Sequence, residues 1–214
     1  MSAARAGVSM LAALVLGAAY LVWDGMNDHG EDEPAPDDDT PDAPPDDSIA
    51  SALSNAPDCV QSLGGPLSVV VGKNRGALGL SDGDLALLLG AISYRETLCG
   101  TSPLLVPPRG GASATGDGGH GRGLMQIDDR YHSSFTDTED WKDPTLNISY
   151  ALTRVLVPSF KSLGDLQQAV AAYNAGNGPI RKSLSLGEDI DARTTGKNYS
   201  AEVLKHARAW GMSA

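Results

Sequence analysis

The sequence predicts a mainly α-helical domain of the α+β class, with one small irregular β-hairpin or sheet, preceded by a single N-terminal transmembrane helix. Three observations carry this prediction. Residues 6–23 are uncharged and almost wholly apolar, residues 24–50 are acidic and rich in proline, and helix start and stop signals recur from residue 51 onward around one glycine-rich stretch. A chain of 214 residues has room for one domain with appendages. We therefore expect a membrane segment at 1–23, a linker at 24–50 and a folded domain at 51–214.

The apolar run at 6–23 is long enough to span most of a bilayer. As a helix it rises about 27 Å, against a hydrocarbon core of ~30 Å. Arg5 precedes the run and Asp24 follows it, so the positive-inside rule places the N-terminus in the cytoplasm and the domain on the periplasmic or cell-wall side. A secretory signal peptide cleaved after Ala19 is the alternative. The run continues to Trp23, which favours an uncleaved anchor, and it lacks the polar face of a soluble helix.

The segment 24–50 carries eleven acidic residues, five prolines and no lysine or arginine. Such a composition cannot bury enough apolar surface to offset the entropy of ordering, so we expect an extended, disordered spacer rather than an acidic interaction tail. Its charge equals the net charge of −11 for the whole chain, so the remaining residues together sum to zero. A neutral domain without a basic patch argues against a nucleic-acid partner.

Cys59 and Cys99 are the two cysteines of the chain. In an exported domain an even pair favours a disulfide, and two buried free thiols are the alternative. The histidines are scattered at positions 29, 120, 132 and 206, so neither a metal site nor a cofactor is predicted.

The folded region opens with a weak helical pattern over Ser51–Leu63 that Pro57 interrupts. A buried central helix then begins after Ser81, an N-cap residue with Asp84 placed to complete the cap, and ends before Gly100 and Pro103. Glu96 falls in its last turn. There the helix dipole and burial both disfavour a negative charge, so both raise the pKa of this carboxyl.

The remaining elements follow from loop and capping residues. Seven glycines between positions 110 and 123 place a loop or short hairpin at 105–122. Four helices follow, at Pro144 to about Leu156 before Pro158, at Leu166–Tyr173 after the cap Asp165, at Pro179–Leu184, and at Asn198–Trp210 before Gly211.

Glu96 and two aspartates form a set that suits glycosidic cleavage. Inverting hydrolysis needs one carboxylic acid to protonate the leaving oxygen and a second carboxylate to activate water on the opposite face. Glu96 is the candidate acid, and Asp117 and Asp128 are candidates for the second role. The alternative interpretation is that these two aspartates only stabilise turns, because aspartate beside glycine is common in turns.

Four sequence segments, in the order given, support the hypothesis of glycosidic cleavage. They are Ile92–Glu96, Gly116–Asp128 with its Gly-Leu-Met-Gln-Ile at 123–127, Ala172–Gly176 with the sequence Ala-Tyr-Asn-Ala-Gly, and Asn198–Tyr199 with Val203. Together they resemble goose-type lysozyme and, more loosely, the soluble lytic transglycosylases that share its lysozyme-like fold. The similarity covers roughly Ser81 to Trp210 and nothing before residue 50.

The resemblance implies a role for each matching residue. Glu96 would be the general acid, and Asp117 and Asp128 would hold the attacking water. Gly123, Leu124, Met125 and Gln126 would form the floor of the cleft, Tyr173 and Asn174 would contact the glycan, and Tyr199 would hydrogen-bond near Glu96. Core packing is the alternative for Met125 and Tyr173. The chain departs from the family at Thr97, where serine is common, at Leu98–Cys99, and at Arg122.

The function that follows is hydrolysis of the β-1,4 bond between N-acetylmuramic acid and N-acetylglucosamine in peptidoglycan. A lytic transglycosylase, which forms 1,6-anhydro products and does not require the two aspartates, is the first alternative. A non-catalytic glycan-binding domain is the second. A membrane-tethered wall-cleaving enzyme fits a phage lysis or virion protein, or a bacterial remodelling enzyme, and its compactness favours phage.

Overall fold

The computed structural model describes residues 47–138 and 140–214. The predicted membrane span at 6–23 and the acidic segment up to residue 46 lie outside these residues. Within the described ranges, no helix has both the length and the apolar character needed to cross a bilayer. The boundary predicted between residues 50 and 51 falls inside helix α1 (Asp47–Ala52), because Ile49 is buried in the core and draws the preceding residues into the domain.

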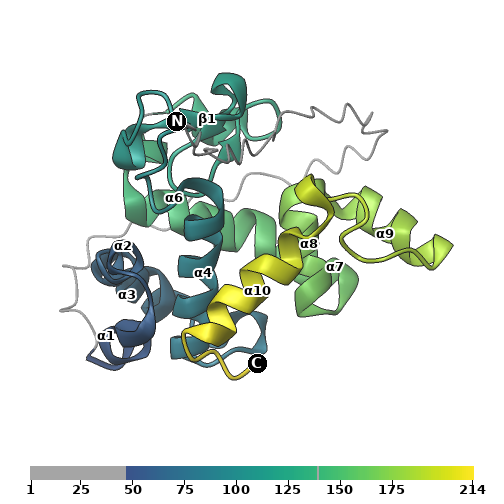
Figure 1. Ribbon diagram of the computed structural model, residues 1–214, viewed down its shortest axis with the longest axis horizontal. Coiled ribbons are helices and arrows are strands. Elements are labelled where there is room, and N and C mark those ends of the chain that lie inside the picture. Colours follow the sequence, from purple (N-terminus) through teal and green to yellow (C-terminus); the bar gives the residue numbers. More distant parts are fainter. Residues whose placement is uncertain (1–46, 139) are drawn as a thin grey trace, which may run out of the picture. The chain divides into compact units, whose positions relative to one another are not determined.

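Helix α4 (Asp82–Thr97) is the central element of the domain. It packs against α1, α2 (Asp58–Gln61) and α3 (Gly64–Lys73), and against α10 (Tyr199–Ala209). Figure 1 shows α4 running between the α1–α3 group and α10, with its C-terminal end toward the strands. Its apolar residues are buried on most faces, as the sequence predicted. The helix α3 was not predicted, since its glycines weaken the local signal.

Both ends of α4 have local causes. The Ser81 side chain accepts a hydrogen bond from the Asp84 backbone N–H at 3.1 Å, which confirms the predicted N-cap. The helix ends at Thr97 because Leu98 and Cys99 adopt left-handed φ angles of 50° and 53°, and the Cys99 N–H bonds back to the Ser93 carbonyl. The chain therefore turns immediately after Glu96 and Thr97.

The predicted small sheet is present. It has three antiparallel strands in the order β1 (Thr115–Gly116), β2 (Gly121–Arg122) and β3 (Ile127–Asp128). Thr115 pairs with Arg122, and Arg122 pairs with Ile127. With each strand only two residues long, the sheet serves mainly to bring residues 115–128 into one layer.

The C-terminal half of the domain is helical. It contains α5 (Ser133–Thr136), α6 (Pro144–Tyr150), α7 (Val157–Leu163), α8 (Leu166–Ala175) and α9 (Asn177–Leu186). Asp143 and Asp165 cap α6 and α8 through their side chains, as predicted.

The prediction that Pro158 ends a helix near Leu156 is wrong. A π-helical segment, Ala151–Leu156, joins α6 directly to α7, and Pro158 lies in the first turn of α7. Proline lacks an N–H and crowds the preceding turn, and the wider π spacing accommodates that loss without breaking the helix.

Candidate active site

Glu96 lies at the C-terminal end of α4 and is partly buried. Burial raises its pKa from 4.5 to about 7, and the negative charge of Asp117 adds a smaller increase. The hydrogen bond from Tyr199 and the charge of Arg95 act in the opposite direction without cancelling the effect of burial. Glu96 therefore keeps a proton to about neutral pH, as a general acid requires.

The Tyr199 hydroxyl donates a hydrogen bond to Glu96 Oε1, which confirms the contact predicted for this pair. The Tyr199 ring is 1% exposed, so it is part of the wall behind Glu96 rather than a surface for a ligand. Burial raises the pKa of Tyr199 well above its ordinary value, so the phenol stays protonated and remains a donor.

Tyr199 is the first residue of α10, and a buried aspartate fixes that end of the helix. Asp191 accepts hydrogen bonds from the backbone N–H groups of Ser200 and Ala201 and from the Ser200 hydroxyl, at 2.8–3.0 Å. These are N–H groups that the first turn of a helix leaves unpaired. Asp191 thus holds the start of α10, and with it Tyr199, in place.

Two further side chains pack on the Tyr199 ring. The Arg95 guanidinium lies 5.4 Å from the ring centroid, and its Nε forms a 2.8 Å ion pair with Glu202. The Tyr173 ring stacks at 6.5 Å with an interplanar angle of 14°. The position of the Tyr199 hydroxyl is therefore determined by α4, α8 and α10 together.

The turn at 123–127 is tied to the same helix end. The buried Thr97 hydroxyl lies 3.0 Å from the Leu124 carbonyl and accepts from the Gly100 N–H at 2.9 Å. Threonine thus supplies here the hydroxyl that serine would supply. Tyr173 donates from its hydroxyl to the Met125 carbonyl at 2.5 Å.

Gly123 and Asn147 fit together closely beneath this turn. The buried Asn147 amide accepts from the Met125 N–H at 2.8 Å and donates to the Arg122 carbonyl at 3.2 Å. Gly123 has φ 70°, and a Cβ there would lie 2.6 Å from both Asn147 Nδ2 and the Trp141 carbonyl. Only glycine satisfies both the backbone angle and the space.

The structure corrects the predicted contribution of three side chains to the cleft floor. Leu124 and Met125 are 2% and 0% exposed and belong to the hydrophobic core. The Gln126 amide donates to the Gly123 carbonyl at 2.8 Å and packs tightly against Gly116 and Gly121, so it supports the sheet. The side chains of Leu124, Met125 and Gln126 therefore serve packing and support of the sheet.

Asp117 and Asp128 lie on neighbouring segments of the sheet region and share one partner. Arg130 donates from Nη2 to Asp117 at 2.9 Å, and from Nε and Nη2 to Asp128 at 2.5–3.1 Å. Burial alone would raise the pKa of Asp128, but the hydrogen bonds and charge of Arg130 hold it below its ordinary value. Asp117 acts on Glu96 electrostatically, so the structure brings acid and aspartate into one site.

The other predicted site residues have structural contacts of their own. Asn174 accepts a hydrogen bond from the Thr195 N–H at 2.7 Å, which fixes the loop before α10 against the end of α8. The predicted pair is brought together, with the sulfur atoms of Cys59 and Cys99 2.9 Å apart, but the favoured disulfide is not formed and both cysteines are free in this structure. Burial raises the pKa of the Cys99 thiol, and the neighbouring Cys59 raises it further.

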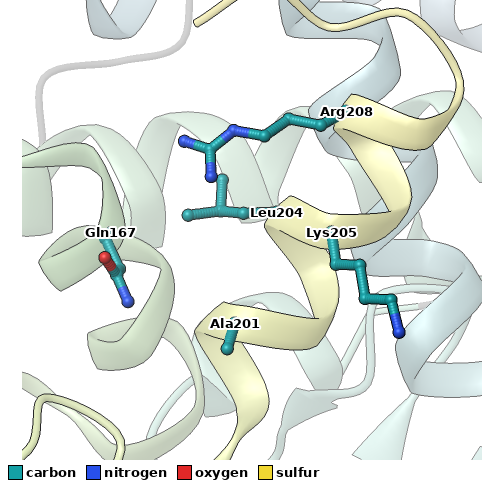
Figure 2. Close-up of a pocket in the computed structure, with 5 residues that line it drawn as sticks. All are labelled: Gln167, Ala201, Leu204, Lys205 and Arg208. Atoms are coloured by element: carbon teal, nitrogen blue, oxygen red, sulfur yellow. The ribbon is translucent and has the colours of Figure 1, made fainter.

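A separate hollow of about 410 Å³ lies between α8 and α10. Figure 2 shows its lining residues, with Gln167 on α8 facing Leu204 and Arg208 on α10. None of the predicted site residues lines it. Among residues 47–138 and 140–214, no group of three or more histidine, cysteine or acidic side chains is placed to hold a metal ion.

Three residues of this region were missed from the sequence: Asn147, Asp191 and Arg130. Asn147 contacts the turn at 123–127, and Asp191 contacts the start of α10. Both do so from segments separated from their partners in the sequence, so no local pattern marks them. Arg130 lies two residues after Asp128, and an arginine close to two candidate carboxylates was a signal that could have been used.

Comparison with known proteins finds similarity over part of this chain. Residues 109–194 match the model of the family described as "Transglycosylase SLT domain". Asp117, Asp128 and Tyr173 lie inside the matched region, whereas Glu96 and Tyr199 flank it.

The chain is also similar to Lysozyme G of Dromaius novaehollandiae, at 29% identity over 98 residues. The match covers 44% of this chain and 46% of that relative, so it spans about half the length of the curated protein. The predicted resemblance to the lysozyme-like and lytic transglycosylase family is confirmed. One of these names denotes a transglycosylase and the other a lysozyme, and the two reactions differ in the group that attacks the sugar.

Proposed function

We propose that this protein cleaves the β-1,4 bond between N-acetylmuramic acid and N-acetylglucosamine in peptidoglycan by hydrolysis. The observation that carries the proposal is the protonated carboxyl of Glu96, with a pKa of about 7, beside a sheet that presents Asp117 and Asp128. The similarity to the transglycosylase SLT domain and to lysozyme G supports the substrate class.

Glu96 supplies the proton in this scheme. The Tyr199 hydroxyl hydrogen-bonds Oε1 of Glu96, and no other side chain among the described residues hydrogen-bonds this carboxyl. We therefore assign the transferred proton to Oε2, which faces the glycosidic oxygen in this scheme. As the bond from the anomeric carbon to that oxygen breaks, the oxygen takes the proton and leaves as a hydroxyl. Glu96 is then ionised and recovers its proton from solvent.

Water replaces the leaving sugar. One of the two aspartates accepts a proton from the water as its oxygen bonds to the anomeric carbon on the opposite face. Arg130 keeps the pKa of Asp128 below its ordinary value, so this carboxylate is ionised while Glu96 is still protonated. An acid and a base with separated pKa values are the condition for this chemistry near neutral pH.

A transglycosylase is the second candidate, favoured by the matched family description. In that reaction the muramic acid 6-hydroxyl attacks in place of water, and Glu96 acts first as acid and then as base. Hydrolysis is preferred here because Asp117 and Asp128 are both present and held together, which a reaction without water does not need.

Digestion of purified peptidoglycan in H₂¹⁸O, followed by mass spectrometry, tests the proposal. Hydrolysis places ¹⁸O on the new reducing end of muramic acid, and transglycosylation gives anhydro ends without label. Unlabelled anhydro products as the sole outcome would overturn the hydrolase assignment. Binding of peptidoglycan without any cleavage would instead indicate a glycan-binding domain.

We further propose that residues 6–23 anchor the protein in a membrane, with the acidic segment tethering the domain near the wall. A tether raises the local concentration of enzyme at its substrate. Deletion of residues 1–23 should move the protein from the membrane fraction to the soluble fraction, and an unchanged distribution would contradict the anchor.

A further inference from the structure

Arg130 bridges the two aspartates of the candidate site. Its Nη2 donates a hydrogen bond to Asp117 at 2.9 Å. The same guanidinium also binds both carboxylate oxygens of Asp128, with Nε donating at 2.9 and 3.1 Å and Nη2 donating at 2.5 Å. Exposed ion pairs usually contribute only ~0–1 kcal/mol, but bidentate geometry within a network of several charges is the exception to that rule.

The two aspartates depend on Arg130 to different degrees. Asp128 also accepts from the Arg130 backbone N–H at 2.9 Å and lies in β3. The Asp117 side chain is 67% exposed, and Arg130 is the one described residue that hydrogen-bonds its carboxylate. Asp117 also sits between glycines with a left-handed φ of 48°. Without Arg130, Asp117 would be free to turn into solvent.

Arg130 also offsets the repulsion between the two aspartates. Two carboxylates held near each other repel, and one of them tends to take up a proton. A guanidinium between them, charged at every working pH, offsets this repulsion and holds the pKa of Asp128 below its ordinary value. Two carboxylates held together by one guanidinium can accept both hydrogen bonds of a single water molecule.

We propose that Arg130 is a positioning residue that holds Asp117 and Asp128 as a pair, and that this pair lets water rather than the muramic acid 6-hydroxyl attack the sugar. The inference rests on the proposed function and extends it, because it names the residue that selects the attacking group. Arg130 itself need not contact the reacting atoms.

The test measures the ratio of ¹⁸O-labelled reducing ends to 1,6-anhydro ends released from peptidoglycan by the full-length protein. Arg130→Ala should reduce labelled ends on the order of 10- to 100-fold while the anhydro fraction rises, which is less than the ~10²–10⁴-fold contribution of a positioned base because both aspartates are still present. This ratio does not depend on how much enzyme is folded, so loss of stability alone leaves it unchanged. A wild-type ratio in Arg130→Ala overturns the proposal.

Two further variants sharpen the result. Arg130→Lys should restore hydrolysis only in part, because an ammonium cannot grip Asp128 bidentately and reach Asp117 as well. Asp117→Asn should reduce hydrolysis to a similar extent, and adding it to Arg130→Ala should cost little more, since both remove one unit. If the fold-losses of hydrolysis in the two single variants multiply in the double variant, Arg130 and Asp117 act separately, and the proposed pair is overturned.

The matched controls are two other arginines. Arg122→Ala removes the 2.5 Å ion pair between β2 and Asp129 and leaves the bonds of Asp117 and Asp128 to Arg130 intact. Arg181→Ala removes the contact from Arg181 on α9 to Ser162 on α7. Both should keep the wild-type product ratio. If Arg122→Ala changed the ratio as much as Arg130→Ala, the effect would belong to the sheet as a whole and the specific role of Arg130 would fail.

A readout without turnover separates this inference from the proposed function. The titration of Asp128, followed by carboxyl NMR, should move to higher pH in Arg130→Ala. The titratable groups that face it are Asp117 on its neighbouring segment, His120 from the strand connection, and His132 after β3. One outcome is that the wild type cleaves with ¹⁸O incorporation while Arg130→Ala leaves both the Asp128 titration and the product ratio unchanged. That result would support the proposed hydrolysis and would contradict the role of Arg130.

Discussion

The two halves of the candidate site obtain their chemistry in opposite ways. Glu96 sits on α4, a helix packed on several sides, and burial raises its pKa to about 7. Asp117 and Asp128 sit on two-residue strands and their connections, partly in solvent, where Arg130 lowers the pKa of Asp128. The acid is tuned by loss of water and the aspartates by a partner charge.

The difference has a consequence for robustness. A burial effect depends on the whole core, so few single changes will remove it without unfolding the domain. An effect based on one ion-pair network can be removed by changing one exposed side chain. Substitutions on α4 should therefore act on all turnover, and those around the sheet should act on the course of the reaction.

The largest effect is expected from Glu96→Gln. Glutamine preserves shape and can still accept from Tyr199 but has no proton to deliver, so turnover of purified cell walls should fall by at least ~10³-fold. Turbidity clearing measures this, with circular dichroism to show that the fold is kept. Substantial residual clearing by a folded variant would remove Glu96 from the mechanism.

The next effect concerns the turn that joins the two halves. Gly123→Ala adds a Cβ 2.6 Å from Asn147 Nδ2 and the Trp141 carbonyl at φ 70°, so unfolding free energy should fall by roughly 3 kcal/mol in urea titrations. Gly164→Ala is the matched control, with φ 78° and open space, and should lose only about 1 kcal/mol. Equal losses would mean that the close contact with Asn147 contributes nothing.

Burial of Glu96 should also appear as a pH-dependent loss of stability. Because its folded pKa of about 7 lies above the ordinary 4.5, the unfolded chain ionises first as pH rises, and stability falls between about pH 4.5 and 7. Glu96→Gln removes this term, so the variant should exceed wild type by roughly 2–3 kcal/mol at pH 8 and match it near pH 4. A constant difference across this window would show that Glu96 is not tuned by burial.

The smallest effect is expected from Tyr199→Phe. The hydrogen bond from Tyr199 lowers the pKa of Glu96, so its removal should move the alkaline limb of the activity profile to higher pH and reduce the maximum about tenfold. Tyr173→Phe, which loses a bond to the Met125 carbonyl, is the control and should leave that limb in place. A downward shift in Tyr199→Phe would contradict the direction of this contact.

Local sequence signals predicted the elements well where a cap or turn residue decides the outcome. Ser81, Asp143 and Asp165 cap the helices expected of them, and the glycines at 110–123 surround the small sheet. The failures have a common cause. Pro158 remained inside a continuous helix, and Leu124 and Met125 turned inward, because packing by distant segments overrode the local pattern.

The sequence by itself determined the helix that carries Glu96, the position of that residue in its last turn, and the glycines that let the chain fold back beside it. Spacing along one helix and the conformational freedom of glycine are local properties, so they can be read from neighbouring residues. Tertiary structure alone decided that Tyr199 meets Glu96, that Asp191 and Asn147 hold the surrounding backbone, and that Arg130 joins Asp117 to Asp128. These contacts depend on where separate segments meet in space, and the burial that raises the pKa of Glu96 exists only after they have met.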